Sequence, residues 1–193
     1  MENIPDLTII MTNIVNTFPS IYRMLAWVFI FFSLLVVFDG ILDLAASTDR
    51  KRKYFGGRSQ PTGWSGLAKI IIAGFIFNLA SNGQMISITS SIFFSDYSYT
   101  LVTLENFQDS GNGNELSKIT RIAMIGFTQI VGIVAVFKGL LVWIKASDGT
   151  GRETFWHGAA YILFGTLCVQ IGRFLGAIQA TLGFDFFKMI GLV

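Results

Sequence analysis

Cysteine and histidine are nearly absent from this 193-residue chain, which contains one of each, Cys168 and His157. A single cysteine excludes a disulfide framework within the chain, and one histidine with one cysteine cannot form a zinc site. Cys168 lies in an apolar segment that supplies no base, and His157, beside Trp156, is interpreted as a polar residue at the membrane interface. The stretch 149–151 is too short for a phosphate-binding P-loop and lacks its lysine. We therefore expect no enzyme activity, no cofactor and no metal.

Charged residues are also scarce, at 13% of the chain against roughly 25% in soluble domains. Hydrophobic residues make up 52%, and the mean hydropathy is +0.60. This composition predicts a polytopic protein of the lipid bilayer. The net charge of +2 is too small to indicate nucleic-acid binding. The first twenty residues contain Glu2 and Asp6 and lack a basic start, which argues against a cleavable signal peptide.

Long apolar runs, by contrast, are plentiful, and four of them could cross a bilayer core of roughly 30 Å as helices. The first is apolar until Asp39 and Asp43, and the second becomes polar in its later half. The third and fourth each contain a basic residue, Lys138 and Arg173 respectively. As an alternative, the second and fourth are buried or re-entrant rather than fully spanning. The four predicted spans are residues 24–44, 67–92, 119–144 and 159–182.

Residues 1–22 form a separate predicted segment ahead of the first span. Apolar residues recur there at three- and four-residue steps, which predicts an amphipathic helix that begins near Pro5 and ends at Pro19. This helix would lie along the outer membrane surface or, alternatively, pack against the rest of the bundle. The expected fold is an all-α membrane protein: four transmembrane helices in two tandem parallel hairpins, plus this N-terminal helix. Its units are residues 1–22, the first hairpin 23–94, a connection 95–118 and the second hairpin 119–193.

The distribution of basic residues predicts the orientation in the membrane. The turn of the first hairpin, 45–66, is strongly basic, whereas the connection 95–118 is mainly acidic. Both hairpin turns should therefore be cytoplasmic, and the connection and both termini should lie outside, in the periplasm of a bacterium. The basic turn could also contact anionic lipid headgroups or an acidic partner. Its basic residues are Arg50, Lys51, Arg52, Lys53 and Arg58.

An internal repeat relates the two predicted hairpins. Residues 38–42, Phe-Asp-Gly-Ile-Leu, return as Phe-Lys-Gly-Leu-Leu at 137–141, an offset of 99. Residues 64–68, Trp-Ser-Gly-Leu-Ala, return as Trp-His-Gly-Ala-Ala at 156–160, an offset of 92. Because both copies have the same predicted orientation, this is a parallel repeat.

Small residues recur at seven-residue intervals in the second and fourth spans. Such spacing builds a flat helix face against which a neighbouring helix can pack closely. Gly132 and Gly139 give the third span a shorter face of this kind, although glycine is abundant enough for chance to contribute. The predicted packing residues are Gly66, Ala73 and Ala80 in one copy, and Gly158, Gly165, Gly172 and Gly176 in the other.

Charges within the predicted spans need partners, because an unpaired charge in hydrocarbon costs several kcal/mol. Asp39 and Lys138 occupy equivalent places in the two copies, so they could pair across the repeat; alternatively, Lys138 reaches the membrane surface and Asp39 lies in a hydrated mouth. Asp43 and Lys69 lie near the predicted interface and are assigned no special role. Arg173 is predicted near the middle of the membrane, where it faces a lumen or another subunit, or forms a structural ion pair.

The whole chain resembles the IcmC/DotE family of inner-membrane components of the Dot/Icm type IVB secretion apparatus. The resemblance is carried by residues 4–7 (Ile-Pro-Asp-Leu), residues 16–19 (Asn-Thr-Phe-Pro) and the duplicated Phe-x-Gly and Trp-x-Gly elements. Each hairpin also resembles a conjugative pilin. These resemblances imply a non-catalytic subunit that oligomerises with other membrane components of a secretion channel.

Two other functional classes are alternatives to a structural subunit. A small oligomeric transporter or channel would have a pore lined by Arg173 and by polar residues of the second and fourth spans. A membrane enzyme is disfavoured, because the sequence contains no acid–base pair or nucleophile constellation. The first expectation is therefore a structural subunit of a translocation complex, with the transporter as the alternative.

Overall fold

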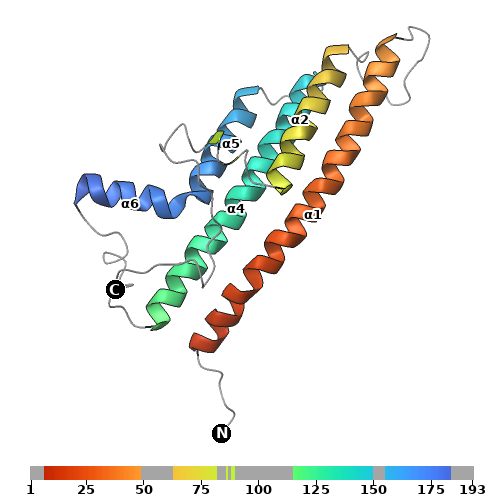
Figure 1. Ribbon diagram of the computed structural model, residues 1–193. Coiled ribbons are helices and arrows are strands. Elements are labelled where there is room, and N and C mark those ends of the chain that lie inside the picture. Colours follow the sequence, from red (N-terminus) through yellow and green to blue (C-terminus); the bar gives the residue numbers. More distant parts are fainter. Residues whose placement is uncertain are drawn as a thin grey trace.

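Five helices with defined bounds make up most of the computed structural model (Figure 1). The structure describes residues 7–48, 63–81, 86, 88–89, 115–149 and 155–183. Regular secondary structure within these residues is entirely helical. The helices are α1 (Leu7–Thr48), α2 (Gly63–Ser81), α4 (Glu115–Ser147), α5 (Phe155–Val169) and α6 (Ile171–Leu182).

Three of these helices are long and apolar enough to cross a membrane: α1, α2 and the part of α4 from Leu116 to Ser147. A fourth crossing is counted if α5 and α6 are one span, broken between them by a bend of 76°. The chain is therefore a multi-pass, all-helical membrane protein. The basic residues 50–53 and 58, and the connection 95–114, lie outside the described residues.

The expected boundary between an N-terminal surface helix and the first span is absent, because α1 runs through Pro19 without a break. Proline removes one backbone donor, yet membrane helices tolerate it where local adjustments and neighbouring helices satisfy the freed groups. Val15, one turn before Pro19, and Phe18, directly before it, are buried against the rest of the protein, which holds this part of α1 in place. At 42 residues, α1 is roughly 63 Å long, about twice the thickness of a bilayer core.

The expected fourth span, by contrast, is two helices rather than one. The backbone turns at Gln170, whose N–H donates to the Thr166 carbonyl and whose carbonyl accepts from Phe174 N–H. Helix α6 then ends at Leu182, and Gly183 after it adopts the left-handed conformation (φ 72°) that glycine accommodates without strain. The second half of residues 159–182 therefore leaves the direction of α5.

Helices α1 and α2 form one antiparallel pair, and α4 and α5 form another (Figure 1). Helices α1 and α4 run in the same direction, so the two hairpins are parallel. The same glycines make the contact inside each hairpin. A Cβ added at Gly66 would lie 2.7 Å from the Gly40 carbonyl oxygen, and one added at Gly139 would lie 2.7 Å from that of Gly158. Both duplicated sequence elements thus mark helix crossings.

A second crossing lies one heptad further from the hairpin turns. In the second hairpin, Cβ atoms added at Gly132 and Gly165 would lie 2.6 and 2.8 Å from the carbonyl oxygen of the other glycine. In the first hairpin the equivalent positions are Ser33 and Ala73, and the Ser33 hydroxyl donates to the Ala73 carbonyl over 3.0 Å. The close face does not extend to Gly172, which has open space around it, because the chain has already turned at Gln170. Ala80 packs on the core, and the surroundings of Gly176 lie outside the described residues.

The hairpins are staggered along their common axis. The ring of Phe29 stacks on that of Phe137, with centroids 4.3 Å apart, and Phe32 meets the same ring edge-on at 5.6 Å. Phe29 and Phe137 are 108 positions apart, whereas the repeat offset of α1 and α4 is 99. The second hairpin is therefore displaced by nine residues, about 13 Å at a rise of 1.5 Å per residue, toward the N-terminal end of α1.

Candidate functional site

Lys69 is the most deeply buried charged residue described, with 1% of its side chain exposed. Its ammonium nitrogen lies 2.7 Å from Asp39 Oδ2, 2.5 Å from Asp43 Oδ2 and 2.9 Å from Asp148 Oδ1. All three donor hydrogens of a lysine can therefore be directed at carboxylate oxygens. We call these four residues the Lys69 cluster.

The members of the Lys69 cluster come from both hairpins. Asp39 and Asp43 are four residues apart on α1, so they lie on the same face of that helix. Lys69 projects from α2 between them, and Asp148 follows the last residue of α4. The stagger brings the end of α4 to the level of residues 39–43 of α1. Asp148 is thus the link by which the second hairpin joins the charge pairing of the first.

The cluster contains one cation and three carboxylates. Asp43 and Asp148 have 7% and 15% of their side chains exposed, whereas Asp39 has 39% exposed and faces partly outward. A buried charge is tolerated where its desolvation is offset by well-aligned partners, and removing one partner from such a set is strongly destabilising. The ammonium group occupies the centre that a bound cation would take. Among the described residues, no group of His, Cys, Asp and Glu is placed to hold a metal ion.

The expected pairing of Asp39 with Lys138 is not the one that forms. Lys138 donates to the Tyr161 hydroxyl over 3.1 Å, and its nitrogen lies 4.5 Å from the Tyr161 ring centroid. Because of the stagger, Asp39 and Lys138 are displaced along the axis by about 13 Å, too far for an ion pair. The assignment of no special role to Asp43 and Lys69 was also wrong, since both belong to the cluster.

The repeat nevertheless accounts for both contacts. The offset of 99 relates Asp39 to Lys138, and the offset of 92 relates Lys69 to Tyr161. The same two positions therefore touch in each hairpin, as an aspartate–lysine pair in one and a lysine–tyrosine pair in the other. The Gly40–Gly66 crossing places Lys69 beside Gly40, so the register of that crossing, rather than the repeat offsets alone, identifies Lys69 as the partner of Asp39.

A second polar group joins α1, α4 and α5 at the other end of the bundle. The Tyr22 hydroxyl donates to the Gly126 carbonyl at 3.2 Å and lies 3.4 Å from Gln129 Oε1. Gln129 in turn donates from Nε2 to the Val169 carbonyl at 3.1 Å, next to the bend between α5 and α6. Tyr22 and Gln129 are both buried, so these contacts fix the relative heights of the three helices.

Replacing Tyr22 with phenylalanine tests this link. The change removes the hydroxyl and leaves the ring, so the free energy of unfolding should fall by about 0.5–1.5 kcal/mol. Thr17→Val is the matched control, because the exposed Thr17 hydroxyl bonds only to Asn13 of its own helix among the contacts seen. Both variants can be measured by titrating detergent-solubilised protein with sodium dodecyl sulfate. Equal stability of Tyr22→Phe and wild type would show that the hydroxyl contributes nothing.

The remaining candidate residues lie apart from the Lys69 cluster. Arg173 is partly buried on α6, beyond the bend, and therefore not in line with the span that was expected to hold it. His157 is exposed at the start of α5, and Cys168 is partly buried near its end. None of these residues is brought together with the charges of α1 and α2.

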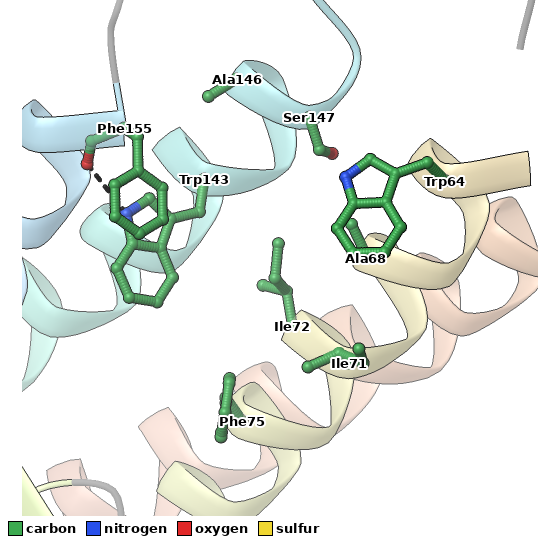
Figure 2. Close-up of a pocket in the computed structure, with 9 residues that line it drawn as sticks. All are labelled: Trp64, Ala68, Ile71, Ile72, Phe75, Trp143, Ala146, Ser147 and Phe155. Carbon is green, nitrogen blue, oxygen red and sulfur yellow. Dashed lines mark hydrogen bonds between the residues drawn. The ribbon is translucent and has the colours of Figure 1, made fainter. Parts of the chain in front are cut away.

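An open groove of about 330 Å³ lies beside the cluster, between α2, the end of α4 and the start of α5 (Figure 2). Trp64 forms one wall, and Trp143, stacked on Phe155 with ring centroids 4.8 Å apart, forms the other. The Trp143 indole N–H also donates to the Phe155 carbonyl over 3.0 Å. The remaining lining is Ala68, Ile71, Ile72, Phe75, Ala146 and Ser147.

Comparisons with known proteins give no match to a family model, to a curated protein or to a solved structure.

Proposed function

We propose that this chain is a structural subunit of a protein-translocation complex in the bacterial inner membrane, of the type IVB secretion class that its sequence resembles. The observation that supports a structural role best is the Lys69 cluster. Its charges are directed at one another across three helices, so they tie two hairpins together. Charges that line a transport pathway would instead face a hydrated passage.

The outer surface of α1 supports a role in assembly. A row of large apolar residues is exposed along this helix, at positions that would face lipid or neighbouring subunits. Helices in a membrane associate through packing and interhelical hydrogen bonds, and such a surface offers a broad area for this packing. The exposed residues include Trp27, Phe31, Leu34, Leu35, Phe38, Ile41 and Leu42.

The proposed orientation places both hairpin turns in the cytoplasm, following the basic residues of the first turn. The N-terminal third of α1, which exceeds the length needed to span the bilayer, would then project into the periplasm. In this arrangement α1 itself can reach components on the periplasmic side. The partners proposed are other membrane subunits of the same apparatus and further copies of this chain.

The alternative, a small transporter or channel, has less support from the described residues. Gln129 is engaged with Tyr22 and Val169, and Gln170 is buried at the bend. Arg173 lies on a helix that leaves the direction of the span. Of the polar groups expected to line a pore, Gln170 and Arg173 therefore lie at and beyond the bend, and most of the polar half of the second span lies outside the described residues.

Affinity purification in a mild detergent, followed by mass spectrometry, distinguishes the two functions. The tagged chain should co-purify from its native membrane with a defined set of other membrane proteins, at fixed ratios. An unrelated multi-pass protein of similar abundance, purified in the same way, serves as the control. Isolation of the chain alone, together with ion or solute flux in vesicles that contain only this protein, would reject the structural role in favour of the transporter.

A further inference from the structure

The groove between Trp64 and Trp143 is a consequence of the stagger. Because the second hairpin is displaced toward the N-terminal end of α1, α5 begins below the level at which α1 ends and α2 begins (Figure 1). Among the described residues, no helix packs directly against this side of the part of α2 nearest its own turn. Trp64, Ile71 and Phe75 are consequently exposed, with Ile72 and Ala68 behind them (Figure 2).

The length of the groove matches one leaflet of a bilayer. Its α2 wall extends from Trp64 to Phe75, eleven residues or about 16 Å of helix. Half of a hydrocarbon core of roughly 30 Å is about 15 Å. Trp64 lies at the turn end, at the depth where tryptophan is enriched in membrane proteins because its ring contacts chains and its N–H meets the headgroup region.

The lining also identifies what can fill the groove. It is formed almost wholly by aromatic and aliphatic side chains of two membrane-spanning helices and the helix that follows them. Water would find few partners there, and an empty groove would deprive its walls of dispersion contacts. Three of its lining residues, Trp64, Ile71 and Phe75, are exposed on a helix that is apolar and long enough to span a membrane, so lipid could reach them.

We propose that the groove holds one acyl chain of a phospholipid from the leaflet at the hairpin-turn end. The chain lies along α2 between the Trp64 indole and the Trp143–Phe155 stack, with its headgroup near Trp64 and Ser147. The lipid fills the space that the second hairpin leaves open, and it bridges α2 to the α4–α5 pair. This inference depends on the membrane location of the helices and is independent of the proposed role in secretion.

Ala68→Phe tests the proposal, because a ring at this wall position would occupy the groove. Wild-type protein purified under delipidating conditions should retain one phospholipid per chain by native mass spectrometry, and Ala68→Phe should lose it. Ala45→Phe is the matched control, since Ala45 is exposed on α1 and does not line the groove. Equal lipid retention by Ala68→Phe and Ala45→Phe, or no retained lipid in wild type, would overturn the proposal.

A fluorescence experiment reaches the same decision by a second route, with phenylalanine in place of every other tryptophan so that the groove wall formed by Trp143 stays aromatic. Two single-tryptophan proteins are compared, one retaining Trp64 and one retaining Trp27, which is similarly exposed (73% and 67%) but lies on α1 away from the groove. In detergent, one equivalent of a phospholipid with brominated acyl chains should quench Trp64 and leave Trp27 bright. The quenching should persist when the headgroup is changed and disappear when a short-chain lipid is used. Equal quenching of the two tryptophans, or dependence on headgroup alone, contradicts an acyl-chain site.

Discussion

Replacing Lys69 with methionine should lower the free energy of unfolding by about 3–5 kcal/mol, the range observed when one partner is removed from a buried ion pair. The change leaves Asp43 and Asp148 beside one another with little exposure and without the ammonium group that holds them together. We expect the hairpins to separate at their turn end before the rest of the bundle unfolds. Unfolding in mixed micelles with sodium dodecyl sulfate, followed by circular dichroism, measures the loss.

Lys138→Met is the control for this variant. Lys138 is also a membrane lysine, but it is exposed and contacts Tyr161, so its loss should cost no more than about 1 kcal/mol. A Lys69→Met, Asp43→Leu double variant adds a second check. Its loss should be smaller than the sum of the two single losses, because each change removes part of the same network. Similar stability of Lys69→Met and Lys138→Met would show that the cluster does not hold the hairpins together.

The second large effect is expected at the glycine crossings, where two substitutions of the same kind should have opposite signs. Gly66→Ala places a Cβ 2.7 Å from the Gly40 carbonyl oxygen and 2.9 Å from the Leu44 nitrogen, both backbone atoms that cannot move alone. Such overpacking costs about 1–3 kcal/mol. Gly74→Ala on the same helix meets nothing within 4 Å and should be neutral or stabilise by up to about 1 kcal/mol, because alanine favours helix.

The comparison of Gly66→Ala with Gly74→Ala uses the same unfolding measurement. Gly139→Ala should behave like Gly66→Ala, since its Cβ would lie 2.7 Å from the Gly158 carbonyl oxygen. If Gly66→Ala and Gly139→Ala were both as stable as Gly74→Ala, the close crossings would not contribute to the stability of the bundle.

Contacts within each hairpin could be predicted from the sequence, whereas contacts between the two hairpins could not. The repeated Phe-x-Gly and Trp-x-Gly elements mark the places where the backbones meet, because only glycine permits this approach and each hairpin packs on itself. The height of one hairpin relative to the other depends on which rings interlock between α1 and α4. Phe29 and Phe137 set that height, and no short sequence pattern encodes their stacking.

The expected ion pair failed for this reason. Pairing Asp39 with Lys138 assumed that equivalent residues lie at equal depth, and the displacement of about 13 Å removed that equality. The predicted ends of the helices were wrong for a similar reason, because they also depend on contacts between helices. Pro19 was expected to end a helix, yet the packing of Phe18 and Tyr22 holds α1 together there. Gln170 has no intrinsic tendency to end a helix, and its turn coincides with the point where Gln129 holds the Val169 carbonyl.

The stagger also limits how far the duplication can extend. The operation that carries the first hairpin onto the second combines a sideways step with a shift of about 13 Å along the helix axes. A third hairpin added by the same operation would be lifted by about 26 Å, nearly the full thickness of the hydrocarbon core. In a row of hairpins built in this way, a third member would no longer lie within a flat membrane. Repetition by this shift consequently ends at two hairpins. The neighbours of this chain in any larger assembly must be joined to it by a different geometry.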